Sequence, residues 1–356
     1  MNKLSAKHFI LFILGVTCIS FKTYPSLFIK LGGRDTWVYT LITFFVFLAF
    51  AIYLIYGMSS RKTYDINEIF TSGLSKYIGN LFLFLFALGL FLASIEATTV
   101  EANVVKTCFF LKTPAWYIII FFLIPSVILL GKNFKTLLIF IIISVFSLLA
   151  NTVLLDIIVE TYKDVKYVLP VFSGNVASEL LNTGLLILGS LSAFVIALPY
   201  LKYLTKDDKI KKHSLIALLI IGFVCTYVIL GIISTFGPLR AANIFYPEFS
   251  QSQRVQIAGF LEFGELFFLY QTVVGFFVKY ILCAYGVYLI FEKFIKNRKY
   301  FIAIYTILVF IISTLLAGNN YVLFNILKYY QYVNLVLFIL IPLIAFIAFN
   351  FKFKKK

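Results

Sequence analysis

The sequence predicts an all-α polytopic membrane protein with about ten transmembrane helices. Of its 356 residues, 62% are hydrophobic and only 13% are charged, which is more apolar surface than a soluble domain of this length can bury. The apolar residues occur in segments of about 20 or more, whereas a transmembrane barrel strand needs only about ten. The spans are therefore helices, and lipid is the main solvent of the chain.

The predicted spans follow one another along a single integral membrane domain, residues 1–356. We place the helices at residues 8–29, 35–57, 78–108, 114–131, 135–158, 179–204, 213–236, 257–290, 300–318 and 329–350. The third and the eighth exceed the ~20 residues that cross a bilayer, so we expect them to tilt, to kink or to project beyond it. Lys3 and Lys7 precede an apolar run, as in a signal peptide, but no A-x-A site follows, and we expect this segment to be retained.

The distribution of charge predicts the orientation in the membrane. A formal net charge of +16 would favour nucleic-acid binding in a soluble protein, but here the basic residues stand in short runs between apolar segments. With the N-terminus in the cytoplasm, 20 of the 31 lysines and arginines lie in cytoplasmic segments, 8 lie on the opposite side and 3 lie within spans. Because cytoplasmic loops are enriched in basic residues, we expect both termini in the cytoplasm.

The residues needed for common enzyme chemistry are missing from the sequence. The four cysteines lie in apolar stretches without a CxxC spacing, and the two histidines, His8 and His213, stand at span ends far from any acidic cluster. No HExxH, GxSxG or phosphate-binding P-loop is present. We therefore expect a protein that is not an enzyme and that uses no metal ion or other cofactor.

Two connecting segments are predicted to be ordered. In residues 64–79, Asp65 stands three positions before Glu68, the spacing of a capping box, which predicts a short interfacial helix. Residues 238–259 combine aromatic side chains with Glu248, Gln251 and Arg254. This second segment is either a lid that lies on the protein or a solvated loop.

Three stretches of the chain resemble one family of membrane proteins. They read KLGGRDTW from Lys30 to Trp37, IEATTVEANVVK from Ile95 to Lys106 with LKTP ending at Pro114, and GFLEFGE from Gly259 to Glu265. In this order they resemble the spore germinant-receptor B subunits (GerAB-type), a branch of the amino acid, polyamine and organocation permease superfamily. The resemblance implies a 5+5 inverted-repeat transporter fold with broken helices 1 and 6, in which repeat one takes in about residues 8–158 and repeat two about residues 179–350.

The same resemblance implies a function and partners. A protein of this family would be a spore germination receptor subunit that binds a small nutrient germinant, such as an amino acid, in a permease-like pocket between spans one, three, six and eight. It would signal to an A subunit in the membrane and a lipoprotein C subunit in the spore inner membrane. Two alternatives remain open: a proton-coupled amino acid permease with net flux, and a structural membrane subunit with a vestigial pocket.

Small and polar residues interrupt the first helix of each predicted repeat. In a broken helix, freed backbone groups can bind the charged ends of a solute. Small residues can also merely let helices pack closely. Unlike better-known amino acid permeases, span one lacks closely spaced glycines. The ligand-binding candidates are Thr17, Cys18, Ser20 and Thr23 in span one and Gly184, Gly189, Ser190 and Ser192 in span six.

Lys22 is the most informative single residue, because a charge near the bilayer centre costs about 2.5–3.5 kcal/mol. Glu96, Glu262 and Glu265 also fall in the outer half of their spans, and Glu262 and Glu265 share one face of span eight. We hypothesise that Lys22 pairs with Glu96 or Glu265 and replaces a coupling sodium ion or acts as a proton switch. Alternatively, Lys22 extends to the outer headgroups. Lys279 is expected to face an inner vestibule or another helix.

Overall fold

Helices make up nearly all regular structure in the described part of the chain. The computed structural model describes residues 4–172, 175–204, 209–257 and 261–354. The N-terminal part contains α1 (Ala6–Lys22), α2 (Pro25–Gly32), η1 (Gly33–Asp35), α3 (Thr36–Arg61), α4 (Ile66–Gly73), α5 (Lys76–Cys108), α6 (Ala115–Leu130), α7 (Phe134–Val159), η2 (Glu160–Tyr162) and η3 (Val165–Tyr167). The C-terminal part contains α8 (Val176–Leu191), η4 (Ser192–Tyr203), α9 (Ile210–Phe236), α10 (Pro238–Ala241), α11 (Pro247–Ser252), β1 (Gln256–Ile257), β2 (Leu261–Glu262), α12 (Gly264–Phe291), α13 (Arg298–Leu316), α14 (Asn320–Asn334), η5 (Leu335–Leu340) and α15 (Ile341–Lys354).

The length and hydropathy of the helices fit a polytopic membrane protein. Eight helical segments of the described chain are long and apolar enough to cross a bilayer. The first and fourth predicted spans fall on α1, with 17 residues, and on α6, with 16 residues. Both are shorter than the ~20 residues that cross a bilayer at right angles.

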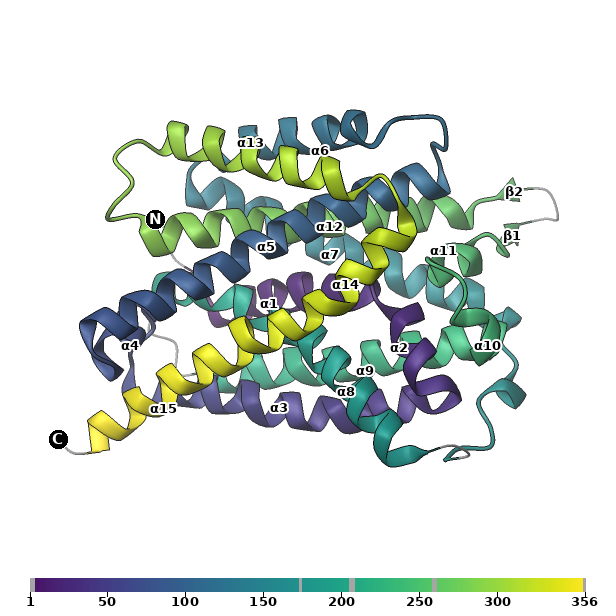
Figure 1. Ribbon diagram of the computed structural model, residues 1–356, viewed down its shortest axis with the longest axis horizontal. Coiled ribbons are helices and arrows are strands. Elements are labelled where there is room, and N and C mark those ends of the chain that lie inside the picture. The colour runs from purple at the N-terminus through teal and green to yellow at the C-terminus, as the bar shows by residue number, and fades with distance from the viewer. Residues whose placement is uncertain (1–3, 173–174, 205–208, 258–260, 355–356) are drawn as a thin grey trace.

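The long helices run side by side along the longest axis, which gives the molecule two ends (Figure 1). One end carries the start of α1, the end of α15 and the short helix α4, and we call it the α4 end. The opposite end carries α2, α10, α11 and the two strands, and we call it the lid end. The predicted helix after residue 64 is α4, and the Asp65 carboxylate caps it by accepting from the Asn67 N–H at 2.9 Å.

The first helix, α1, lies among other helices rather than at the surface. It packs against α7, α8, α9, α12 and η4, and its residues from Phe12 to Thr17 are all buried. A close approach of α12 depends on a glycine, since a Cβ at Gly275 would lie 2.4 Å from Ile19 Cδ1. Outer helices instead expose large apolar side chains, for example Phe146 and Phe223, which suits contact with lipid.

Two predicted span boundaries are wrong. The predicted span eight covers residues 257–290, but α12 begins at Gly264, because Gln256–Ile257 and Leu261–Glu262 form a short antiparallel pair of strands. Glu262 lies on β2, so it does not share a helical face with Glu265 as expected. The predicted span ten covers residues 329–350, but its helix begins at Asn320 and passes through the π-helix η5, which ends two residues before Pro342. A proline in a helix clashes with the preceding turn, and a π-turn relieves that clash.

Candidate functional site

A gap of two residues follows the first helix. α1 ends at Lys22, and α2 begins at Pro25. Proline has no backbone N–H and disfavours the helical conformation in the residue before it, so Pro25 begins a new helix. Tyr24 accordingly adopts φ −114° and ψ 4°, outside the helical region. The residues before Lys22 remain in regular helix, so the interruption is confined to Thr23 and Tyr24.

α1 runs antiparallel to the segment formed by α8 and η4. Near its start the Leu4 N–H donates to the Tyr203 carbonyl at 2.8 Å, and near its end the Ser20 carbonyl accepts from Ser190 Oγ at 3.2 Å. The α-helix α8 changes after Leu191 into a 3-10 helix of 12 residues, although such helices rarely exceed three or four. The interrupted end of α1 therefore lies beside the last turn of the regular helix α8, and the irregular half, η4, runs back along the first part of α1.

Three buried side chains meet beside the gap, and we call them the central cluster. The Tyr24 hydroxyl donates to Glu96 Oε1 at 2.8 Å, and the Lys279 ammonium forms an ion pair with Glu96 Oε2. Glu96 is on α5 and Lys279 is on α12, with side chains 4% and 2% exposed. Because each buried charge costs several kcal/mol of desolvation, neither would be tolerated without the other.

Polar atoms without partners lie next to the central cluster. In the described part of the chain, Thr23 Oγ1 in the gap and Thr99 Oγ1, three residues after Glu96 on α5, are buried and accept or donate no hydrogen bond. The side-chain amide of Gln331 on α14 lies close enough to the Tyr24 hydroxyl to interact with it, whereas the hydroxyls of Thr23 and Thr99 remain without a partner. Such groups each cost about 1–3 kcal/mol when they are left unsatisfied. They are therefore available to a polar solute that reaches the cluster.

The glycines of α8 are packing positions. A Cβ at Gly189 would lie 2.4 Å from the Gln331 carbonyl oxygen, and a Cβ at Gly184 would lie 3.0 Å from Thr43 Oγ1. Gly189 therefore allows the backbone of α14 to approach α8 and brings Gln331 toward the cluster. Close packing is the alternative that the sequence left open for these small residues.

The remaining ligand-binding candidates differ in how their polar atoms are used. Thr17 is buried, and its hydroxyl has no partner among the described residues. Ser20 Oγ donates to the Val16 carbonyl at 2.7 Å, and Ser192 Oγ donates to a carbonyl in its own turn at 2.5 Å. Cys18 is half-buried and lines a cavity between α1, α7 and α9.

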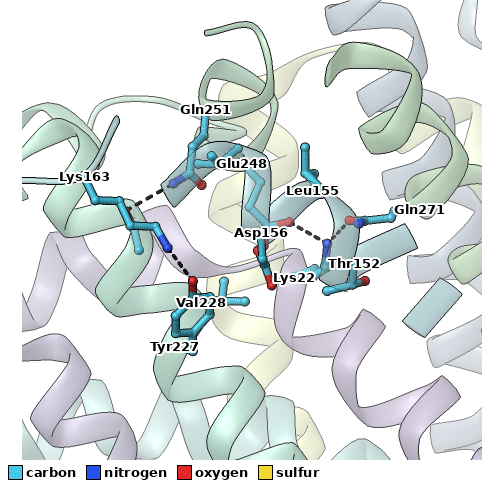
Figure 2. Close-up of a pocket in the computed structure, with 12 residues that line it drawn as sticks. Lys22, Thr152, Leu155, Asp156, Lys163, Tyr227, Val228, Glu248, Gln251 and Gln271 are labelled. Carbon is cyan, nitrogen blue, oxygen red and sulfur yellow. Dashed lines mark hydrogen bonds and ion pairs between the residues drawn. The ribbon is translucent and has the colours of Figure 1, made fainter. Parts of the chain in front are cut away.

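Lys22 forms a pair that the sequence did not predict. Its Nζ lies 2.8 Å from Glu248 Oε2 and donates to Gln271 Oε1, as Figure 2 shows. Asp156 of α7 lies beside them and lines the same pocket. We call these four residues, Lys22, Glu248, Gln271 and Asp156, the outer network. The Lys22 and Glu248 side chains are 17% and 12% exposed, so this pair is more accessible than the central cluster.

The expected pairing of Lys22 with Glu96 or Glu265 is wrong. Glu96 is engaged by Tyr24 and Lys279, and Glu265 accepts from Gln253 Nε2 at 2.8 Å. The segment after α9 packs back onto the protein, and its Glu248 carboxylate forms the ion pair with Lys22. The Glu262 side chain lies outside the described residues.

Residues 237–255, which we call the lid, pack onto the lid end of the molecule (Figure 1). The Tyr246 hydroxyl forms a hydrogen bond with Asn103 Oδ1 of α5. The Phe245 ring lies 4.9 Å from the Phe324 ring of α14, measured between centroids. Gln251 Nε2 donates to Thr235 Oγ1 at 2.8 Å. These contacts decide between the two alternatives for this segment: it lies on the protein.

Stacked aromatic rings close the opposite end of α1. The rings of Phe134 on α7 and Tyr203 on η4 lie 4.2 Å apart between centroids, and Tyr285 of α12 stacks on Tyr200 at 6.1 Å. The Tyr200 hydroxyl donates to the Leu282 carbonyl at 2.6 Å. The central cluster therefore lies between a lid on one side and an aromatic stack on the other.

The depth of Lys279 in the membrane could have been predicted from the sequence if the start of span eight had been placed correctly. Counted from residue 257, Lys279 would lie about 33 Å from the outer end, near the inner surface. Counted from Gly264, where α12 begins, it lies about 22 Å deep, close to mid-membrane. Lys279 does face another helix, one of its two expected environments, and that helix carries Glu96.

A comparison with protein families shows to which group this architecture belongs. The model of a spore permease family, described as spore germination protein, matches residues 5–322. The chain belongs to this spore germination protein family. The match confirms the resemblance carried by the three stretches between Lys30 and Glu265, and it ends before residues 323–356 of the last span. No curated protein matches this spore germination protein.

Proposed function

We propose that this spore germination protein is a receptor subunit that binds a small nutrient germinant, such as an amino acid, at the central cluster. The observation that carries the proposal is the buried group of Tyr24, Glu96 and Lys279 at the gap between α1 and α2. Intramembrane charges are costly, and proteins keep them chiefly where they face a pathway or a ligand.

The charges of the cluster are complementary to those of an amino acid. The Lys279 ammonium and the free N–H groups at the start of α2 favour a carboxylate. The Glu96 carboxylate and the last carbonyls of α1 favour an ammonium group. A zwitterion that separates Glu96 from Lys279 satisfies both charges again, and Thr23 supplies an unpartnered hydroxyl beside it.

The arrangement of helices supports a 5+5 inverted-repeat fold as part of this proposal. The first helix of each proposed repeat, α1 and the α8–η4 segment, run antiparallel and meet at Ser20 and Ser190. Inverted repeats require this relation between their first helices. We further propose that both termini lie in the cytoplasm, so that the α4 end is cytoplasmic and the lid end is external.

Lys22 is proposed to act as the switch of this receptor through its pair with Glu248. Opening of that pair would release the lid, and a changed position of the lid and of α2 would reach partner subunits at the outer surface. These partners are proposed to be an A subunit with membrane spans and a lipoprotein C subunit in the spore inner membrane.

Ligand binding to the purified protein tests the proposal. Amino acids are screened for those that raise the midpoint of thermal unfolding, and the dissociation constant is measured by calorimetry. Thr23→Val removes an unpartnered hydroxyl at constant shape, so we expect weaker binding, by about tenfold, without loss of stability. The control Thr314→Val removes a hydroxyl that is bonded within α13 and is expected to leave affinity unchanged. Equal affinities of both variants, or no ligand at all, would contradict the proposal.

A proton-coupled amino acid permease is the second candidate. The Glu96–Lys279 pair favours it, because buried carboxylates that can exchange partners occur in proton pathways. Uptake of a labelled amino acid into proteoliposomes distinguishes the two candidates. A receptor binds its ligand and accumulates none, whereas a permease accumulates it when a proton gradient is imposed.

A further inference from the structure

A lateral crevice between α7 and α9 is not used by the proposed germinant site. Its volume is about 640 Å³, and its walls come from α1, α7 and α9. This volume falls within the roughly 300–1,000 Å³ of cavities that hold small organic molecules. Side chains on its rim are strongly exposed, with Phe223 at 71%, Ile157 at 65% and Val153 at 57%. The crevice therefore opens toward the side of the helix bundle, where lipid chains lie.

The part of the crevice far from the lid end is lined by apolar side chains, and the part near the lid end is lined by charged and polar side chains. Leu149 and Cys18 line the part far from the lid end, and Asp156, Glu160 and Tyr227 line the part toward it. Asp156 stands one turn before the end of α7 at Val159. Seven residues separate Leu149 from Asp156, which is about 10 Å along a helix. The polar part thus lies close to the end of α7, at the depth where lipid headgroups meet a helix that spans a bilayer.

The charged part carries an excess of acid. Asp156 lines the pocket of Figure 2 together with Lys22, Lys163 and Glu248, and it lines the crevice together with Glu160. Lys22 is paired with Glu248, and Lys163 Nζ donates to Glu160 Oε2 at 2.5 Å. Three carboxylates therefore face two ammonium groups. No residue of the described chain donates a hydrogen bond to Asp156, so its carboxylate is the acceptor left for a ligand.

The geometry points to a phospholipid with a primary amine in its headgroup, of the phosphatidylethanolamine type, seated in this crevice. One acyl chain fills the apolar part along α7 and α9. The ammonium group donates to Asp156 and supplies the missing positive charge. The phosphate lies at the level of Tyr227, which lines the crevice and whose hydroxyl accepts from the Lys163 ammonium of the adjoining pocket at 2.7 Å. An anionic lipid without an amine would add a negative charge to an already acidic site and is disfavoured.

Native mass spectrometry of the full-length protein, released from nanodiscs of equal phosphatidylethanolamine and phosphatidylglycerol with identical chains, tests this inference. We expect one retained phosphatidylethanolamine, enriched about tenfold over phosphatidylglycerol, which is the scale of one charge-assisted hydrogen bond. Asp156→Asn is expected to abolish this enrichment. Val153→Trp, which fills the crevice from its exposed rim, is expected to remove both lipids. Glu68→Gln on α4, at the opposite end, serves as the matched control and should behave as the unmodified protein.

Three outcomes would overturn the inference. They are equal retention of both lipids by the unmodified protein, unchanged enrichment in Asp156→Asn, and unchanged retention in Val153→Trp. A measurement without variants guards against misfolding: phosphatidylcholine, whose quaternary ammonium has no N–H donor, should compete about tenfold less well than phosphatidylethanolamine. Equal competition by the two lipids would also contradict the assignment of Asp156.

Discussion

The central cluster and the outer network both pair a lysine with a glutamate, but the two pairs differ in how they are enclosed. Glu96 and Lys279 lie on two long helices that pack against each other, and their side chains are at most 4% exposed. Lys22 lies at the end of α1, and its partner Glu248 is carried by the lid. Burial makes each charge of the first pair dependent on the other, whereas the charges of the second pair stay partly solvated when the pair opens.

The largest expected effect comes from removing one partner of the central cluster. Lys279→Met leaves the Glu96 carboxylate buried without a counter-charge, and we expect a loss of about 3–5 kcal/mol in the free energy of unfolding. Denaturant unfolding in mixed micelles measures this loss. The double variant Glu96→Gln with Lys279→Met removes both charges and should recover most of it. A single variant as stable as the double variant would mean that the cluster is not enclosed in solution.

A smaller effect is expected where α14 approaches the cluster. Gly189→Ala places a Cβ against the Gln331 carbonyl, so α14 must shift, at a cost of about 1–3 kcal/mol. The same unfolding experiment measures it. The control Gly318→Ala adds a methyl group that meets no atom within 4 Å. If both variants lose the same stability, the close contact of α8 with α14 is not maintained.

Breaking the outer pair should cost about 1 kcal/mol or less, because its charges remain partly solvated. In Glu248→Gln we expect faster hydrogen exchange in residues 237–255 and little change in global unfolding. The matched control is Glu292→Gln, which breaks the Lys202–Glu292 pair of 2.7 Å near the α4 end. Exchange in the lid that stays as slow as in the unmodified protein would show that Lys22–Glu248 does not hold the lid.

Added salt should give the smallest effect and act on only one of the two regions. Raising the ionic strength from about 0.15 M to 1 M shortens the Debye length from roughly 8 Å to 3 Å, which screens exposed charges more than buried ones. We expect hydrogen exchange in the lid to rise about twofold and exchange in α5 around Glu96 to stay constant. An equal increase of hydrogen exchange in the lid and in α5 would contradict the proposed difference in burial between the two ion pairs.

The membrane architecture could be predicted from the sequence, because the backbone of a long apolar segment in lipid can satisfy its hydrogen bonds only as a helix. The short helix at Asp65 was readable for a similar reason, since its capping residue acts within one turn. The start of α12 was not, because Leu261 and Phe263 extend the apolar run of span eight without extending its helix. Hydropathy indicates whether a segment lies in lipid or in water, but it does not indicate at which residue the helix begins.

The candidate site was only partly readable for a related reason. Lys22 and Glu96 were identified by the cost of their charges, but their partners depend on how distant segments pack. Glu248 is more than two hundred residues away from Lys22 along the chain and reaches it only because the lid folds back. Which side chains pair in a helix bundle depends on the rotation of each helix about its axis and on the depth of each residue in the membrane. An error of seven residues in the start of span eight was enough to place Lys279 near the inner surface and not at mid-membrane.

The π-helix η5 sets where the last helix can bend. It separates α14, which carries Gln331 and Asn334, from α15, whose start contains Pro342. A wide turn next to a proline has fewer and weaker backbone hydrogen bonds than the helix on either side. Because α15 packs against α4 and α14 packs against α8, a bend at this joint would change the distance between Gln331 and Tyr24 while α15 keeps its contacts.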